Sequence, residues 1–294
     1  MKGPPDPGMT YKRQKRVVTF LFLLAPMALL LVFGYLPVIN MSWYSFTNWD
    51  GLTQSKWVGL ENYQALFTRV ENYRVFGTSL YYFVGSFVQL TLALFFATVL
   101  SFKTRFSNFY KGVLFFPNLI NGVAIAFIFL YFFRDTGSLN SLLRALGLGS
   151  WAQLWLTNPA LINYSLTGVS IWRYLGFNMV LFLGAIQSIS SEIFEATDID
   201  GASRWQQFRF IIFPTIRPVV YLNLVLALRG SLAVFEIPYI MTGGGNGSMT
   251  FVIRTVDTAF KFSKFGLASA MAIVLTLIIF LVTAVQSRLF REKE

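Results

Sequence analysis

The chain has 294 residues, of which 55% are apolar, 18% are aromatic and only 13% carry a charge. These fractions lie outside the range of soluble domains and indicate an integral membrane protein. The chain contains no cysteine and no histidine, which excludes disulfides, thiolate metal sites and histidine catalysis. We therefore expect neither a catalytic nor a metal site. The net charge of +11 does not indicate nucleic-acid binding, because the basic residues fall mainly in short loops beside apolar runs, where they suit anionic lipid.

Apolar runs long enough to cross a membrane recur along the chain. About twenty helical residues span the roughly 30 Å of hydrocarbon in a bilayer. Residues 1–16 and 291–294 are expected to be short tails around one membrane domain over 17–290. The predicted fold is all-α, with six transmembrane helices at residues 17–39, 78–101, 112–133, 166–188, 213–236 and 266–287.

Lysine and arginine are distributed unequally between the two sets of loops. The two tails and the loops at 102–111 and 189–218 hold fourteen of them, against eight in the longer loops opposite. The positive-inside rule therefore predicts that both termini are cytoplasmic. Segments expected on the other side contain rings typical of a membrane interface, namely Trp43, Tyr44, Trp49, Trp57, Trp151 and Trp155.

Polar side chains inside the expected spans are candidates for a solute path, because such groups are costly in lipid and are often functional. Their amides suit sugar hydroxyls and their rings offer flat apolar faces. The alternative is that they hold neighbouring helices together. Arg173 and Glu236 are also candidates for an ion pair or gate, with Glu236 expected on the same helix face as Arg229. The candidate path residues are Gln89, Asn121, Trp172, Arg173, Asn178 and Arg229.

The segment 190–218 is unusually polar for its place between two apolar runs. It holds four of the thirteen acidic residues of the chain. A serine at 190 or 191 can cap a helix whose first turns carry Glu192 and Glu195, where the helix dipole favours acids. Gly201 then supplies a turn, a second helix follows, and Pro214 and Pro218 are expected to stop it before the next span. The segment alone is equally consistent with a capped helix lying at the membrane surface.

The spacing within this segment resembles a known motif. Glu195-Ala196-Thr197, three residues, Gly201, nine residues and Ile211-Ile212-Phe213-Pro214 is similar to the EAA loop of binding-protein-dependent ABC transporter permeases, with Thr197 and Phe213 as mild departures. The resemblance implies that residues 190–218 form a coupling helix that docks on a cytoplasmic ATPase. The coupling residues that it implies are Glu195, Ala196, Asp198, Gly201, Ala202, Trp205, Phe208 and Pro214.

Other stretches resemble the carbohydrate-type branch of that family. Residues 242–250 are similar to its T-x-G-G-P segment, with Asn246 where proline is common, and the tail is similar to the F-type subunit of maltose transporters. The "GGGNG" run lacks the lysine of a phosphate-binding loop, so it is not a nucleotide site. It is interpreted as a turn before the last helix or as a contact for a solute-binding protein.

The resemblance implies the architecture and the partners of a type I ABC importer. These partners are a second permease subunit, two ATP-binding subunits that hold ATP and Mg, a solute-binding protein and a sugar, all at a bacterial inner membrane. This chain itself is expected to bind no cofactor. An ion-coupled carrier is the alternative, but the chain offers no mid-membrane carboxylate for proton coupling. A lipid-facing scaffold and a permease for a phosphorylated solute contacting Arg229 or Arg173 also remain open.

Overall fold

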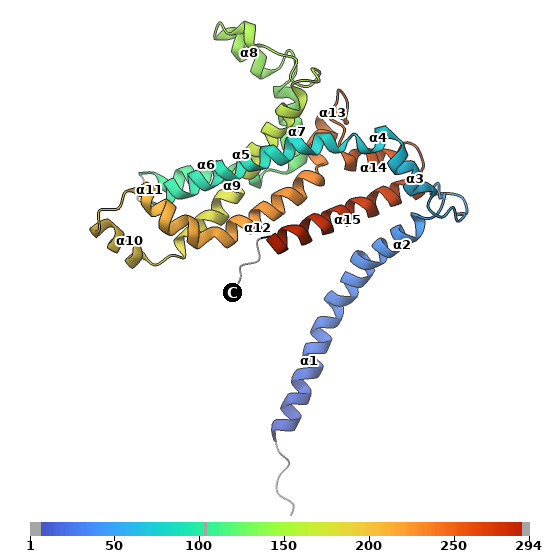
Figure 1. The fold of residues 1–294 in the computed structure, drawn as a ribbon, viewed down its shortest axis with the longest axis horizontal. Helices are drawn as coiled ribbons and strands as arrows, with labels where there is room; N and C mark the ends of the chain where they lie inside the picture. Colours follow the sequence, from blue (N-terminus) through green and yellow to red (C-terminus); the bar gives the residue numbers. More distant parts are fainter. Residues whose placement is uncertain (1–6, 103–104, 290–294) are drawn as a thin grey trace, which may run out of the picture. The chain divides into compact units, whose positions relative to one another are not determined.

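The computed structural model describes residues 7–102 and 105–289 (Figure 1). In these residues β-structure is confined to an isolated bridge between Thr47 and Trp57, so the all-α prediction is confirmed. The tail at 291–294 and the first part of the tail at 1–16 lie outside the described residues. The chain forms two compact units, one of Met1–Leu66 with Thr258–Ile273 and one of Phe67–Asp257 with Val274–Glu294.

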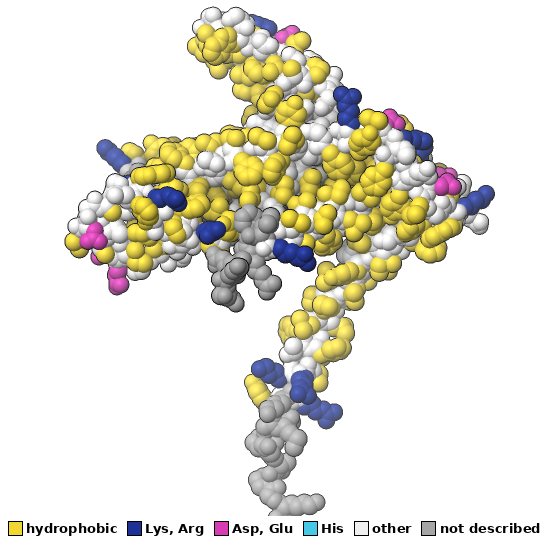
Figure 2. Space-filling model, in the orientation of Figure 1, with side chains coloured by type: hydrophobic (Ala, Val, Ile, Leu, Met, Phe, Trp, Pro, Cys, Tyr) yellow, Lys and Arg dark blue, Asp and Glu magenta, His cyan; other side chains and the backbone are white. Residues whose placement is uncertain are grey.

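The first unit contains one long apolar helix. It runs through α1 (Pro7–Leu29), the π-helical turn η1 (Leu30–Tyr35) and α2 (Leu36–Tyr44). The amide of Leu36 bonds five residues back to the carbonyl of Leu31, so the wider turn lies just before Pro37, which has no amide to donate. Residues Arg13–Tyr44 form a candidate membrane span, in agreement with the expected span at 17–39. Basic side chains gather at its N-terminal end (Figure 2).

The chain after α2 folds into a hydrogen-bonded turn at the start of α3 (Glu61–Thr68). The Asn62 side-chain amide donates to the carbonyls of Ser45 and Thr47 at 2.9 and 2.8 Å. The amide of Gly266, near the start of α15 (Phe265–Leu289), donates to the carbonyl of Trp49 at 2.9 Å. These bonds satisfy backbone groups that would otherwise be costly near a membrane.

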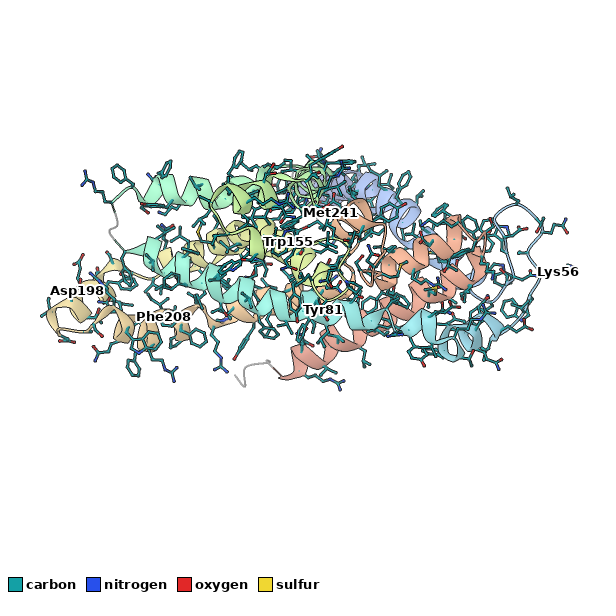
Figure 3. All side chains as sticks on the ribbon, turned by 90° about the horizontal axis from the view of Figure 1, so that it is seen from above. Lys56, Tyr81, Trp155, Asp198, Phe208 and Met241 are labelled. Atoms are coloured by element: carbon teal, nitrogen blue, oxygen red, sulfur yellow. The ribbon has the colours of Figure 1, made fainter. Side chains whose placement is uncertain are left out.

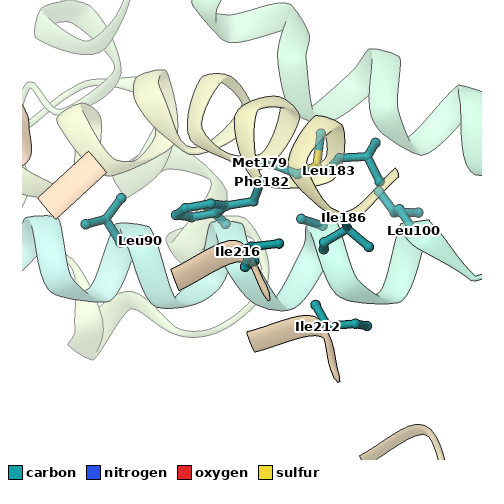
Figure 4. Packing of buried hydrophobic residues seen from close by; sticks show 10 residues of the cluster. Leu90, Leu100, Met179, Phe182, Leu183, Ile186, Ile212 and Ile216 are labelled. Carbon is teal, nitrogen blue, oxygen red and sulfur yellow. The ribbon is translucent and has the colours of Figure 1, made fainter. Parts of the chain in front are cut away.

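The second unit holds most of the other helices, together with residues 274–289 of α15. Its largest hydrophobic cluster joins α5 and α9 to the start of the fifth span, with Met179 and Phe182 fully buried at its centre (Figure 4). Its members on α5 and α9 recur three or four residues apart, which is the spacing of one helix face. The elements, including α14 at its boundary, are α4 (Val70–Tyr73), α5 (Phe76–Ser101), α6 (Ser107–Leu119), α7 (Gly122–Phe132), α8 (Ser138–Ala145), η2 (Gly149–Trp151), α9 (Ile162–Gln187), α10 (Ser191–Ile199), α11 (Arg204–Gln207), η3 (Phe208–Ile212), α12 (Phe213–Leu232), α13 (Glu236–Thr242) and α14 (Phe251–Phe260).

The third expected span, at 112–133, is divided in the structure between α6 and α7. The described residues contain five helices that are long and apolar enough to cross a membrane, and a sixth only if α6 and α7 are taken together across a bend of 96°. The break falls at Ile120, whose backbone is extended, and Asn121, whose side-chain oxygen accepts from the amide of Val123 at 2.8 Å. Asn121 thus caps the start of α7, which lets a new helix begin inside the unit.

The fifth span differs from its expected range of 213–236 at both ends. Pro214 and Pro218 do not stop the preceding helix: α11, η3 and α12 are continuous, and Pro214 lies in the first turn of α12. The amide of Phe213 bonds five residues back, so the π-helical turn absorbs the irregularity before Pro214. The chain then breaks over residues 233–235, and Glu236 begins the separate helix α13. Its expected position on one helix face with Arg229 is therefore wrong.

The glycine-rich run at 242–250 forms a tied turn. Thr242 and Ser248 share a side-chain hydrogen bond of 2.7 Å, and the Asn163 side chain donates to the carbonyl of Gly247 at 3.1 Å. Asn246 has a φ of 53°, which asparagine tolerates but the proline ring, fixed near −65°, cannot adopt. The departure from the T-x-G-G-P pattern therefore has a conformational reason.

A close approach between α6 and α9 leads to a stability prediction. A Cβ built on Gly176 would meet the backbone of Leu114 and Phe115 in α6, whereas nothing lies within 4 Å of a Cβ on Gly184 of the same helix. Gly176→Ala should lower the free energy of unfolding by about 1–3 kcal/mol, because backbone cannot yield as a side chain does. Gly184→Ala should be neutral or stabilise by up to about 1 kcal/mol through helix propensity.

Thermal unfolding of both variants in one detergent measures the difference, and Gly184→Ala controls for the helix-propensity effect. Equal unfolding temperatures for the two variants would contradict the close approach.

Candidate functional site

The polar loop between α9 and α12 is built from two capped helices. Ser190 accepts from the amide of Glu192 at 3.3 Å, as predicted, and caps α10. Gly201 has a φ of +73°, which confirms a turn that needs a left-handed residue. Ser203 and Gln206 then form a reciprocal capping box at the start of α11. We call residues 190–218 the coupling loop, and its acidic side chains are visible at the α10 end in Figure 2.

A buried side chain that the sequence interpretation missed fastens the two helices of this loop together. Gln207 is fully buried, and its Nε2 donates to Thr197 Oγ1 at 3.0 Å and to Asp198 Oδ1 at 2.7 Å. Its Oε1 accepts from Arg204 at 2.8 Å. Arg204 also pairs with Asp198 at 3.4 Å and lies over the ring of Phe102. The loop is therefore a fixed hairpin rather than two independent helices.

The predicted coupling residues divide between an exposed and a covered group. Phe208 and Ala202 are half-buried, and Phe208, labelled in Figure 3, packs against the cluster of Figure 4. Trp205 is 68% exposed although its ring lies 5.4 Å from that of Phe208. The hairpin therefore presents an apolar ring beside acidic groups. The exposed members of the predicted set are Glu195, Ala196, Asp198, Gly201, Trp205 and Pro214.

A cavity of about 510 Å³ lies among α5, α9, α12 and α13 of the second unit. This volume falls within the roughly 300–1,000 Å³ of small-molecule sites. The polar side chains lining it include Tyr82, Ser86, Gln89, Ser170, Arg173, Asn178, Asn223, Ser231 and Glu236.

Several polar atoms of the cavity have no hydrogen-bond partner within the described part of the chain. They are the hydroxyl of Tyr82, Oδ1 of Asn223 and Nε of Arg173. Buried polar atoms are normally paired, because an unpaired one costs about 1–3 kcal/mol. These three atoms are covered by the surrounding protein, so the polar groups available to a ligand are the other polar side chains that line the cavity.

An ion pair crosses one wall of the cavity. Arg173 Nη1 of α9 lies 2.6 Å from Glu236 Oε2 of α13, so these residues form an ion pair, which the sequence offered as one alternative. The guanidinium also lies 5.0 Å from the ring centre of Tyr174. The pair therefore connects a continuous helix with the short helix that follows the break at 233–235.

Three of the six candidate path residues line this cavity and three do not. Gln89, Arg173 and Asn178 line it. Asn121 caps α7, and Trp172 makes an edge-to-face contact with Phe129, while the side chain of Arg229 is exposed. The sequence interpretation missed Tyr82, Asn223 and Ser231. The same signal, a polar group inside an apolar run, would have found them.

Comparison with known proteins places the chain in a family. The model of the "Binding-protein-dependent transport system inner membrane component" family matches residues 89–293. The chain belongs to this family. The permease is 33% identical over 285 residues to the probable ABC transporter permease protein YurN of Bacillus subtilis, covering 95% of this chain and 97% of that one. It is 32% identical over 279 residues to the multiple sugar-binding transport system permease protein MsmF of Streptococcus mutans, covering 93% and 95%.

The fold of the permease is also that of a solved transporter. The structure of a bacterial ABC transporter involved in the import of the acidic polysaccharide alginate has a TM-score of 0.84, with 22% sequence identity and coverage of 96% and 98% of the two chains. The recognition of the family from the EAA-like spacing is therefore confirmed, and so is the permease architecture. At this identity the likeness shows the fold alone.

The buried amide of Gln207 leads to a prediction about the coupling loop. Gln207→Leu should destabilise the hairpin by about 0.5–1.5 kcal/mol, because α11 loses the two hydrogen bonds that join it to Thr197 and to the exposed Asp198. Hydrogen–deuterium exchange of the purified protein should become faster in α10 and α11 and stay unchanged in α5. Gln206→Leu, which removes the neighbouring cap side chain, is the control and should affect α11 alone. Unchanged exchange in α10 of Gln207→Leu would show that the amide does not hold the hairpin.

Proposed function

We propose that this permease moves a sugar or oligosaccharide through the cavity among α5, α9, α12 and α13 by alternating access, driven by ATP hydrolysis on separate subunits. The observation that carries the proposal is the connection between the coupling loop and the cavity. The loop begins two residues after α9 ends and runs without a break into α12, and both helices line the cavity. A displacement of the loop is therefore transmitted to two walls of the cavity.

The partners follow from the family and from the exposed face of the loop. We infer that Glu195, Ala196, Asp198, Gly201 and Trp205 dock on an ATP-binding subunit, which supplies the ATP and Mg site. Ala202, Phe208 and Pro214 support this surface from behind or beside it. A second permease subunit, a second ATP-binding subunit and a solute-binding protein complete the assembly, as the words "binding-protein-dependent" in the family description suggest. The chain itself is a transport subunit without a catalytic site.

The orientation follows from the distribution of charge. The basic tails and the coupling loop lie on the side that the positive-inside rule makes cytoplasmic. With α6 and α7 counted as one broken span, the even number of six crossings supports the proposal that both termini lie on that side of the cell membrane. This orientation presents the loop to the cytoplasmic ATP-binding subunits.

A carbohydrate solute is supported by the cavity and by the relatives. The lining side chains of Ser86, Gln89, Ser170 and Asn178 carry donors and acceptors that suit sugar hydroxyls, and Phe177 and Tyr174 supply apolar ring faces. One similar permease is described as part of a multiple sugar-binding system.

The conformation of Gly201 provides the test of the coupling role. Nothing lies within 4 Å of a Cβ built there, so the difficulty for a side chain is its φ of +73° and not space. Gly201→Val should cost about 1–2 kcal/mol locally and displace the turn, whereas Gly201→Asn, which tolerates this region, should behave almost as the parent. Combined with Glu195→Ala, Gly201→Val should abolish solute-stimulated ATP hydrolysis in the reconstituted complex.

The same samples supply the control. Membrane insertion should be unchanged because it depends on the apolar spans. Co-purification of the ATP-binding subunits should fall. Normal co-purification and normal stimulation in the Glu195→Ala and Gly201→Val double variant would show that residues 190–218 are only a surface hairpin.

A further inference from the structure

The charges of the cavity are balanced within the cavity. Among its lining residues in the described part of the chain, Arg173 and Glu236 are the only charged side chains. Their atoms lie 2.6 Å apart, and the side chains are 14% and 40% exposed. Arg217 and Arg229, the other arginines of the expected spans, do not line the cavity. A solute in the cavity therefore meets donors and acceptors but no unmatched charge.

The position of the ion pair is fixed by a third element. A Cβ built on Gly122 would collide with both Glu236 Oε2 and Arg173 Nη1, so the pair occupies the space that this glycine leaves open. Gly122 is the first residue of α7, directly after the 96° break. Glu236 is the first residue of α13, directly after the second break. The backbone breaks of two spans thus bring a carboxylate to the one arginine of the cavity.

We propose that Glu236 makes this cavity selective for neutral oligosaccharides and against uronates and sugar phosphates. The inference rests on the proposed function, because it assumes that the solute occupies this cavity. An arginine without a partner in a partly desolvated site recruits carboxylates and phosphates through bidentate hydrogen bonds. Glu236 already occupies that position on Arg173, so an anionic solute brings a charge that nothing compensates.

Glu236 is therefore a specificity-determining residue, because its carboxylate competes with a carboxylate or phosphate of the solute for Arg173. The likeness to the alginate transporter does not decide the charge of the solute, since it shows only a shared fold. Selectivity against anions is set by side chains within that fold, and two residues far apart in the sequence carry it here.

Ligand pairs that share one skeleton and differ in charge provide the test. The permease, in complex with its partner subunits in nanodiscs, would be titrated with digalacturonate and its dimethyl ester, and with maltose 6′-phosphate and maltose, by saturation-transfer NMR. The wild type should bind the neutral member of at least one pair at least about tenfold more tightly than the charged member. Glu236→Gln keeps the shape of the side chain and should remove or reverse this preference.

Two further variants make the result specific. Glu61→Gln removes one negative charge outside the cavity and should keep the wild-type preference. Glu236→Gln combined with Arg173→Met should lose the gain in anion binding, because the recruiting cation is gone. Equal binding of both members by the wild type, or an unchanged ratio in Glu236→Gln, would overturn the proposal. Failure of both pairs to bind any variant would instead overturn the sugar cavity of the proposed function, and this inference with it.

Discussion

The need to pair the charge of Arg173 with that of Glu236 is the constraint on which the arrangement of the second unit depends. A charged side chain within a membrane-spanning segment must face a partner or a cavity, because exposure to lipid is costly. Arg173 sits in the middle of the continuous helix α9, so its partner has to be brought to it. The break before α13 places Glu236 Oε2 2.6 Å from Arg173 Nη1. The break before α7 places Gly122 beside the pair, where a side chain would collide with both residues. Irregular backbone at such depth is tolerated where protein or a cavity surrounds it.

The same helices that form the cavity also connect it to the coupling loop. The hydrogen bonds of Gln207 hold α10 and α11 of the loop together. Because α11, η3 and α12 are continuous, the loop is joined directly to a helix that lines the cavity. The cluster around Met179 and Phe182 packs α5 and α9 against the start of α12, and close packing of this kind passes on displacements. This arrangement supports the proposed coupling between the loop and the cavity.

The sequence predicted the apolar spans and the turn at Gly201, and it offered an ion pair at Arg173 and Glu236 as one alternative, because each depends on local chemistry. The length of an apolar run, a glycine where φ must be positive and a charged residue within an apolar run can all be read directly from the sequence. The break at 233–235 was not predicted, since Ala233, Val234 and Phe235 are as apolar as their neighbours. The break at Ile120 was not predicted either, although Asn121-Gly122 is a turn signal inside an apolar run. Asn121 was placed in the path although it caps a helix, and Gln207 was not singled out because its three partners come together only in the folded loop.

The absence of native cysteine allows a direct test of whether the described cavity is the solute path. Ser86 lines the cavity, while Val84, two residues away on α5, is 54% exposed and does not line it. The account predicts that Ser86→Cys, in the reconstituted complex during transport, reacts with a small hydrophilic methanethiosulfonate reagent and that solute slows this reaction, while Val84→Cys does not react. Reaction of Val84→Cys at least as fast as that of Ser86→Cys, with protection by solute only at Val84→Cys, would place the path on the opposite face of α5 and contradict the account.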